Sequence, residues 1–283
     1  MVLRVVRLGL IGLGIVYAIG LGVIYGKQRD FVFDREFSSA LKEPGSIAIA
    51  GSTRVEIPTS DGEQLAGWYL PPRDKNGIVF LFFHGKGGAL ERKKWRWKRI
   101  IEHGDGVLAF SYRGFPGSTG LPSEAGLYED ARAAYHWLTE KHEPSRIVLH
   151  GLSLGTGVAA KLATEVEAKA LVLEAPYAAL VDVAAGRHPY FPVSYLLWDQ
   201  FRTENFIADI KMPLLIVHGD HDTAIPLDDA RKLFQLAPQP KKLVIMEGSD
   251  HNTLVRDGIY PQIWAFLKGV HNLGISTQSA GRT

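Results

Sequence analysis

Apolar and polar positions follow two alternating periods from about residue 77 onward. Short runs of consecutive apolar residues, typical of strands buried on both faces, are separated by stretches in which apolar residues recur at helical spacing. This alternation predicts an α/β fold, with a mostly parallel, twisted sheet and helices on both faces. The expected strands are Ile78–Phe83, Val107–Ser111, Arg146–Leu149, Ala170–Leu173, Pro213–Gly219 and Lys242–Met246, and the expected helices are Ala89–Glu102, Glu124–Glu140, Leu154–Thr164 and one near Pro261.

Two segments depart from this alternation. Val55–Pro58 and Gln64–Leu70 flank an Asp61-Gly62 turn, which predicts a β-hairpin ahead of the parallel strands. The segment 177–208 interrupts the pattern after the Ala170–Leu173 strand and is long enough for a short lid of one or two helices. Five of its aromatic and leucine side chains are expected to line a substrate pocket; they are Tyr190, Phe191, Tyr195, Leu196 and Trp198.

The N-terminus carries an apolar segment of another kind. Leu8–Gly26 is a run of 19 residues without a charge, with two arginines before it and Lys27 and Arg29 after it. That length just spans a bilayer and predicts one transmembrane helix that anchors the chain. The alternative is a signal peptide cleaved near Ala18-Ile19-Gly20, which would leave a secreted or periplasmic protein. Positive charges are nearly balanced at the two ends, so the membrane topology stays open.

These boundaries divide the chain into four parts. We expect a membrane anchor at 1–28, a connector at 29–52, one α/β domain at 53–271 and a flexible tail at 272–283. With 283 residues, of which 46% are hydrophobic, the chain is long enough for one sizeable core. The net charge of +2 gives no reason to expect nucleic-acid binding, and the absence of cysteine excludes disulfides and thiolate metal sites. No cofactor or metal is expected, and the oligomeric state is left open.

A candidate nucleophile follows the Arg146–Leu149 strand. Gly151-Leu152-Ser153-Leu154-Gly155 stands between this strand and a predicted helix. A serine at such a turn is exposed at the carboxyl edge of the sheet, beside the first amides of the helix. The pentapeptide is a weak signal by itself in a glycine-rich chain, so the other members of the site must decide.

Those members follow three other predicted strands. The strand Pro213–Gly219 leads into Asp220 and Asp222, and Lys242–Met246 leads into His251. A serine hydroxyl needs a neighbouring base, and an imidazole titrates near neutral pH. The turn His84-Gly85-Lys86-Gly87-Gly88, after the first strand, is suited to aim a backbone N–H at an oxyanion. We expect the donors to be the amides of Lys86 and Leu154, with Gly85 as the alternative to Lys86.

Together these motifs resemble those of the α/β-hydrolase superfamily, in its small branch with one N-terminal membrane anchor and no large cap. The resemblance also includes the loop Ser111–Gly120 and covers about residues 53 to 270. It implies a triad of Ser153, Asp222 and His251, in that chain order, with Asp220 as the rival acid. The sequence departs from the family at Ser111, where Asp is usual, and at Lys86, where Asn is frequent.

One charged residue and one charged segment are assigned structural roles. Arg113, in the loop that resembles the family, is expected to be a buried ion that forms hydrogen bonds within the fold. The segment Glu91–Arg99 is unusually basic and aromatic. Within it, Trp97 falls on a core-facing helical stripe, and the cationic positions are interpreted as a solvated helix face.

The function that these observations favour is a membrane-anchored serine hydrolase. Its substrate would be a carboxylic ester or thioester with an apolar, lipid-like acyl group, cleaved through an acyl-enzyme at Ser153. A serine peptidase or amidase is the alternative, since the same triad serves both reactions. A non-catalytic interaction protein on this fold is less favoured, because all three triad positions are filled.

Overall fold

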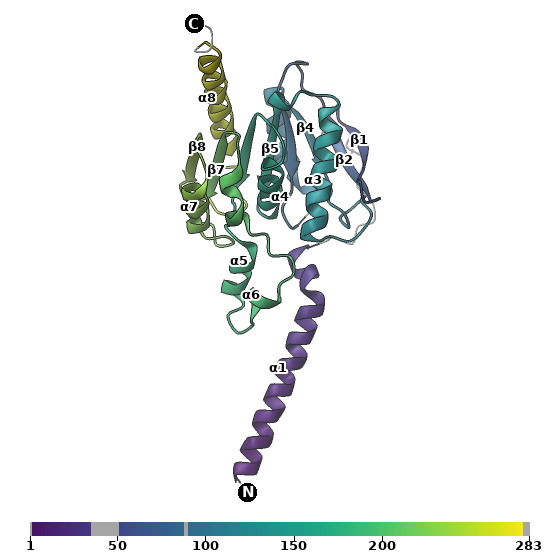
Figure 1. Ribbon diagram of the computed structural model, residues 1–283, viewed down its shortest axis with the longest axis vertical. Coiled ribbons are helices and arrows are strands. Elements are labelled where there is room, and N and C mark those ends of the chain that lie inside the picture. Colours follow the sequence, from purple (N-terminus) through teal and green to yellow (C-terminus); the bar gives the residue numbers. More distant parts are fainter. Residues whose placement is uncertain (1, 35–50, 88–89, 280–283) are drawn as a thin grey trace.

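The computed structural model describes residues 2–34, 51–87 and 90–279, and it contains one eight-stranded sheet (Figure 1). The strand order is β1-β2-β4-β3-β5-β6-β7-β8. The first two strands pair antiparallel with each other, β2 pairs antiparallel with β4, and the remaining pairs are parallel. The predicted fold class is therefore confirmed. The bounds are β1 Thr53–Pro58, β2 Gln64–Leu70, β3 Val79–Phe83, β4 Gly106–Phe110, β5 Ile147–Leu152, β6 Ala170–Glu174, β7 Leu214–Gly219 and β8 Lys241–Met246.

Helices cover both faces because the central strands are apolar on both sides. Every residue of β3, β4, β5, β6 and β7 is buried. One core cluster joins the sheet to α3, α4 and α7, and a second joins its other face to α2 and α8. The helix bounds are α2 Lys94–His103, α3 Glu124–Thr139, α4 Leu154–Ala163, α7 Leu227–Leu236 and α8 Ile259–Ser279, with short 3₁₀ turns at Leu90–Lys93, Pro144–Arg146, Thr203–Asn205 and Ile207–Asp209.

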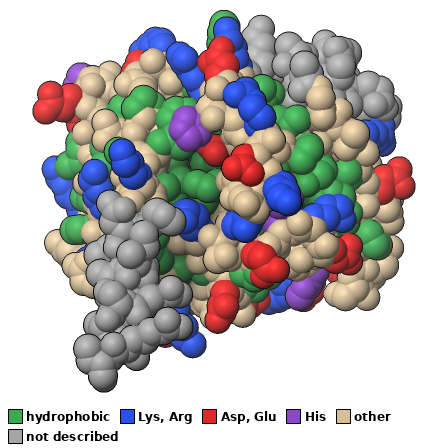
Figure 2. Space-filling view, turned by 90° about the horizontal axis from the view of Figure 1, so that it is seen from above, with side chains coloured by type: hydrophobic (Ala, Val, Ile, Leu, Met, Phe, Trp, Pro, Cys, Tyr) green, Lys and Arg blue, Asp and Glu red, His purple; other side chains and the backbone are tan. Residues whose placement is uncertain are grey.

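The long helix α1, Val2–Val32, projects from one end of this domain (Figure 1). It is long and apolar enough to cross a membrane, with a mean hydropathy of 2.2 in its most apolar window, none of which is buried. Phe33, just after it, is buried against Phe201 with ring centroids 6.3 Å apart. Charged side chains of both signs are spread over the opposite end of the molecule (Figure 2).

Two boundaries differ from those expected. The connector was expected at 29–52, but α1 continues through residues 29–32. Residues 35–50 of the expected connector lie outside the described residues. The helix α8 continues to Ser279 and so includes residues 272–279 of the tail, whose flexibility stays a prediction. Once a helix is nucleated by packed turns, each added residue gains a hydrogen bond at little cost, and weak apolar spacing does not end it.

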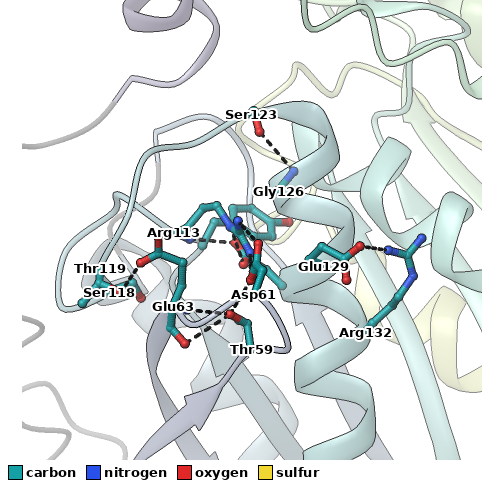
Figure 3. A network of polar contacts seen from close by, with 12 residues as sticks. Thr59, Asp61, Glu63, Arg113, Ser118, Thr119, Ser123, Gly126, Glu129 and Arg132 are labelled. Carbon is teal, nitrogen blue, oxygen red and sulfur yellow. Dashed lines mark hydrogen bonds and ion pairs between the residues drawn. The ribbon is translucent and has the colours of Figure 1, made fainter.

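The hairpin β1–β2 is fixed to the domain by Arg113, as Figure 3 shows. The Arg113 guanidinium donates from Nε to Asp130 Oδ1 at 2.8 Å and from Nη1 to Asp61 Oδ2 at 2.7 Å. Asp61 lies in the hairpin turn and Asp130 on α3. The hydrogen bond from Arg113 is the main reason that the pKa of Asp61 falls to about 2. Arg113 is buried, as expected, and it joins the hairpin, the loop after β4 and α3.

Candidate active site

Ser153 occupies a strained turn between β5 and α4. Its backbone has φ of 51° and ψ of −119°, in a region that non-glycine residues rarely adopt. A Cβ on Gly155 would stand 2.2 Å from the Phe83 carbonyl oxygen, and one on Gly151 would stand 2.5 Å from the Gly155 oxygen. Both glycines are therefore required by close backbone approach. The turn leaves the Ser153 side chain half-buried at the carboxyl edge of the sheet.

The structure brings Ser153, His251 and Asp222 together. Ser153 Oγ lies 3.0 Å from His251 Nε2, and His251 Nδ1 lies 2.7 Å from Asp222 Oδ2. Because a carboxylate can only accept, the proton of the neutral imidazole belongs on Nδ1. His251 Nε2 is then free to accept from the Ser153 hydroxyl. The Asp222 side chain has no exposed surface, whereas that of His251 is 17% exposed. This arrangement can pass one proton between the hydroxyl and the imidazole.

The two aspartates after β7, Asp220 and Asp222, have different hydrogen-bond partners. The Ala224 and Ile225 amides donate to Asp222 Oδ1 at 2.7 and 2.8 Å, which leaves Oδ2 for His251. Burial acts to raise the pKa of Asp222, but the hydrogen bonds from His251 and the two amides hold it below its usual value. Asp220 instead accepts from the Gly248 amide at 2.7 Å and so joins the loops after β7 and β8. The geometry pairs Asp222, not Asp220, with the histidine.

The turn after β3 lies directly against the serine. A Cβ on Gly85 would be 3.3 Å from Ser153 Cβ, so only a bare backbone fits there easily. The buried His84 ring orients this turn. Its Nε2 accepts from the Tyr112 amide at 3.3 Å, so Nδ1 donates to the Gly85 carbonyl at 2.8 Å. Burial lowers the pKa of His84 to about 3, which keeps the ring neutral. In a trans peptide the N–H points opposite to the C=O, so the Lys86 amide points away from His84.

Leu154 is the first residue of α4, so its amide has no intrahelical partner. The Lys86 and Leu154 amides therefore come from the two segments that meet at Ser153. The Lys86 side chain itself is exposed. No group of three or more His, Cys, Asp or Glu side chains suited to a metal ion occurs among the residues that the structure describes.

A buried charge cluster behind the serine was missed by the sequence analysis. The Arg96 guanidinium donates to both Glu174 carboxylate oxygens, at 2.6 and 2.8 Å, and His150 Nε2 lies 3.0 Å from Glu174 Oε2. The Glu174 carbonyl in turn accepts from the Ser153 amide at 2.9 Å. Arg96 lies in the basic segment interpreted as solvated, but only 3% of it is exposed. The available signal was a glutamate and a histidine within the apolar strands β6 and β5.

The lid contains α5, Leu180–Arg187, and the single turn α6, Val193–Leu196. Its five expected pocket residues have two kinds of surroundings, and their role in lining a substrate pocket stays a prediction. Tyr190 and Tyr195 are 85% and 89% exposed, while Phe191, Leu196 and Trp198 face α1. The prediction treated the N-terminal helix as separate from the domain, whereas α1 passes beside the lid and supplies an apolar partner for these side chains.

Known proteins share this fold and much of this sequence. A family model described as "Serine aminopeptidase, S33" matches residues 74–198. The uncharacterized protein Rv2307c of Mycobacterium tuberculosis is 36% identical over 235 residues, which cover 81% of this chain and 82% of that protein. The chain belongs to the α/β hydrolases. The resemblance stated from the sequence motifs is thereby confirmed.

Other α/β hydrolases differ in how much they share with this one. The lysophosphatidylserine lipase ABHD12 of Danio rerio is 31% identical over 199 residues, 63% of this chain and 52% of that protein. The esterase Pf2001 of Pyrococcus furiosus has a TM-score of 0.66 at 21% identity, covering 83% of this chain and 98% of that one. An α/β hydrolase of Vibrio vulnificus has a TM-score of 0.65 at 25% identity, covering 77% and 81%. The Pf2001 likeness shows the fold alone.

Proposed function

We propose that this α/β hydrolase is a membrane-anchored serine hydrolase of carboxylic esters or thioesters with an apolar acyl group. The observation that carries the proposal is the hydrogen-bonded chain Ser153–His251–Asp222 at the carboxyl edge of the sheet. The serine stands on a strained turn, the imidazole has its acceptor nitrogen toward it, and the buried carboxylate holds the other nitrogen. Each group thus has the neighbour that nucleophilic catalysis requires.

In the proposed reaction, Ser153 Oγ attacks the acyl carbon while its proton moves to His251 Nε2. Asp222 stabilises the resulting imidazolium through Nδ1–H. The negative oxygen of the tetrahedral intermediate accepts from the Lys86 and Leu154 amides. As the intermediate collapses, the alcohol or thiol leaves with the proton from His251, and the acyl group remains on Ser153. Water then gives its proton to His251 and attacks the acyl-enzyme, which releases the acid and restores the serine.

Two observations support a lipid-like substrate at a membrane. The helix α1 is long and apolar enough to serve as the anchor, although a signal sequence passes the same test. The Danio rerio relative is named a lysophosphatidylserine lipase, and the substrate in that name is a single-chain amphiphile joined by an ester. A second candidate is an aminopeptidase or amidase, because the matching family model carries the description of a serine aminopeptidase.

The catalytic test is covalent labelling of the full chain with a fluorophosphonate, followed by turnover of matched esters and amides. We expect Ser153→Ala to abolish labelling and to lower kcat about 10⁶-fold, as removal of the nucleophile does in subtilisin. His251→Ala should lose nearly as much, because the members act as a unit. Ser60→Ala, at an exposed serine of the hairpin turn, is the control and should label normally. Undiminished labelling of Ser153→Ala would disprove the assignment, and turnover of amides but not esters would select the peptidase.

The anchor is tested by alkaline carbonate extraction and by sequencing the mature N-terminus. We expect the full chain to stay with the membrane and to keep residues 8–26. A mature protein that begins near Leu21 would show cleavage of a signal peptide instead.

A further inference from the structure

The lid is fastened to α1 by aromatic contacts. We define the lid tip as Pro189–Trp198. The Tyr17 ring stacks on Phe191, with centroids 5.8 Å apart and planes within 7°, and the Tyr17 hydroxyl donates to the Tyr190 carbonyl at 2.9 Å. Between these contacts and the domain, α1 and the lid tip line a half-open apolar pocket of about 50 Å³. The two segments, far apart in sequence, therefore form one surface.

A second set of contacts lies closer to the domain. Trp198 Nε1 donates to the Tyr25 hydroxyl at 2.9 Å, and the Trp198 amide donates to Gln28 Oε1 at 2.7 Å. The two aromatic rings meet edge to face at 5.1 Å. Arg29 Nε lies 2.9 Å from Asp199 Oδ2. Polar and charged groups are thus paired at this level, whereas the contacts around Tyr17 and Phe191 are mainly apolar.

The lid tip exposes apolar surface without any charge. Residues 189–198 contain no Asp, Glu, Lys or Arg, and charged residues stand just outside them at Arg187 and Asp199. Tyr190 and Tyr195 are 85% and 89% exposed. Large exposed aromatics beside an apolar helix are typical of the boundary between lipid and water, where tyrosine and tryptophan are enriched. The opposite end of the domain, in contrast, carries charges of both signs (Figure 2).

The charge-free run of α1 sets the depth of the lid tip. Tyr17 is the tenth of the 19 residues Leu8–Gly26, which lie between Arg7 and Lys27. At about 1.5 Å per residue these 19 residues span about 28 Å, close to the roughly 30 Å of a hydrocarbon core. If α1 crosses the bilayer, this run fills the core and Tyr17 lies near its middle, where Phe191 stacks on it. A transmembrane α1 therefore carries the lid tip below the membrane surface.

Part of the lid-tip backbone is paired internally, which matters because an unpaired N–H is costly in lipid. The Phe191, Val193, Tyr195 and Leu197 amides donate to carbonyls within the lid, and the Trp198 amide donates to Gln28. Prolines at 189 and 192 have no N–H to satisfy.

The same geometry turns the candidate site toward the membrane. The lid follows β6, whose carboxyl end lies at the same edge of the sheet as Ser153, and α5 and α6 extend from this edge beside the domain-proximal part of α1 (Figure 1). Arg187, at the end of α5, donates to the Ala224 carbonyl at 2.7 Å, in the loop that carries Asp222. The lid is thus attached to α1 on one side and to the Asp222 loop on the other.

We propose that the lid tip is a membrane-docking element, which enters a lipid bilayer beside α1 and holds the Ser153 edge at the membrane surface. The partner is the bilayer itself, not a soluble protein. The inference rests on the proposed role of α1 as the anchor, but it adds a second membrane contact that the helix alone does not require.

The chain has no cysteine, so one introduced cysteine gives a unique labelling position. Ser194→Cys is nearly isosteric, exposed and at the centre of the lid tip. The full-length variant is labelled with an environment-sensitive fluorophore and reconstituted in phosphatidylcholine vesicles. Quenching is then measured with nitroxides on the lipid acyl chains and with aqueous iodide. Ile11→Cys, on the exposed surface of α1, reports the anchor, and Glu140→Cys, with a side chain that is 72% exposed at the end of α3, reports water.

We expect acyl-chain nitroxides to quench labels at 194 and 11, and iodide to quench only the label at 140. Quenching by nitroxide at 11 with quenching by iodide at 194 would overturn lid docking and leave the anchor intact. Protection of the 194 label from both quenchers would place protein over the lid tip, for example a second copy of the chain, and would also overturn it. If the label at 11 escapes the nitroxide, α1 does not span the bilayer and the anchor fails as well.

Discussion

The buried pair Arg96–Glu174 offers the sharpest test of how the turn that carries Ser153 is supported. Arg96 comes from α2 and Glu174 from the end of β6, and their side chains are 4% and 2% exposed. Arg96→Ala would remove both hydrogen bonds to the carboxylate and leave His150 as its remaining described partner. The variant would also lose the contact between the guanidinium and the Phe82 ring, in which the guanidinium carbon lies 4.9 Å from the ring centroid.

The cost is dominated by the unpaired carboxylate. Breaking a buried ion pair by removing one partner typically destabilises a protein by about 3–5 kcal/mol. Total stabilities are about 5–15 kcal/mol, so the loss is a large fraction of the whole. At about 2–4 °C per kcal/mol for a domain of this size, the melting temperature should fall by roughly 6–20 °C. The Ser153 amide is bonded to the Glu174 carbonyl, so labelling of Ser153 should weaken as this segment shifts.

The pH dependence of the stability difference between the wild type and Arg96→Ala gives an independent test. In the wild type, burial acts to raise the pKa of Glu174, but Arg96 and the hydrogen bond from His150 hold it well below its usual value. A depressed pKa contributes stability above the unfolded value of about 4.3, and this contribution is lost as the pH falls below it. Without Arg96, burial prevails and raises the pKa, so the variant is penalised most at high pH. The difference between wild type and variant should therefore narrow from pH 8 to pH 5.

The assay is thermal and urea unfolding of the full chain in detergent, followed by circular dichroism. Arg132→Ala is the matched control, since Arg132 also forms ion pairs, with Glu129 and Glu165, but is 34% exposed. It should lose no more than about 1 kcal/mol. The double variant Arg96→Met with Glu174→Gln removes both charges and should recover much of the loss. Equal effects of Arg96→Ala and Arg132→Ala, or a difference that widens toward pH 5, would refute this account.

Two further predictions concern the acid and the substrate. Asp222→Asn should lower kcat by about 10⁴-fold by favouring the wrong imidazole tautomer. Asp220→Asn should reduce kcat far less, because the Asp220 carboxylate accepts from the Gly248 amide at 2.7 Å, whereas His251 is paired with Asp222; the reverse order in steady-state kinetics would move the acid to Asp220. Across p-nitrophenyl esters, kcat/KM should rise from acetyl to medium chains, since each buried methylene adds about 0.8 kcal/mol at most; a preference for acetyl would remove the apolar acyl group from the proposal.

Much of the fold could be predicted from local patterns. The parallel strands are short apolar runs because both of their faces are buried. Between them lie amphipathic helices, whose apolar sides pack on the sheet. The prediction that Trp97 lies on a core-facing stripe is confirmed, since its side chain has no exposed surface. Strand ends also suffice to propose the site, because the carboxyl ends of parallel strands share one edge. For this reason Ser153, Asp222 and His251 could be proposed as one site without a structure, although Ser153 and His251 are 98 positions apart in the sequence.

The features that were missed depend on contacts between distant elements. Arg96 and Trp95 are neighbours in a basic segment, yet Arg96 is buried and Trp95 is 62% exposed. Helical spacing assigns a face to each position. It does not show that the Arg96 face packs against the end of β6, where the Glu174 carboxylate binds the guanidinium. The contacts between the lid and α1 were not predicted for the same reason. Its aromatics suit an apolar surface, and their sequence does not say whether that surface is a substrate or the helix α1.

The position of the lid limits which esters could reach Ser153. If α1 crosses the bilayer, the contact between Tyr25 and Trp198 lies near the lipid–water boundary, and the catalytic edge lies on the domain side of that contact (Figure 1). The ester of a single-chain amphiphile stands at this boundary, beneath a polar headgroup, and needs only a short displacement to meet the serine. A triacylglycerol has no charged headgroup and resides deeper among the acyl chains. It would have to move much farther, and its three chains would have to leave the hydrocarbon. On this geometry, single-chain amphiphiles should be hydrolysed from vesicles much faster than long triacylglycerols, and equal rates would count against a site held at the surface.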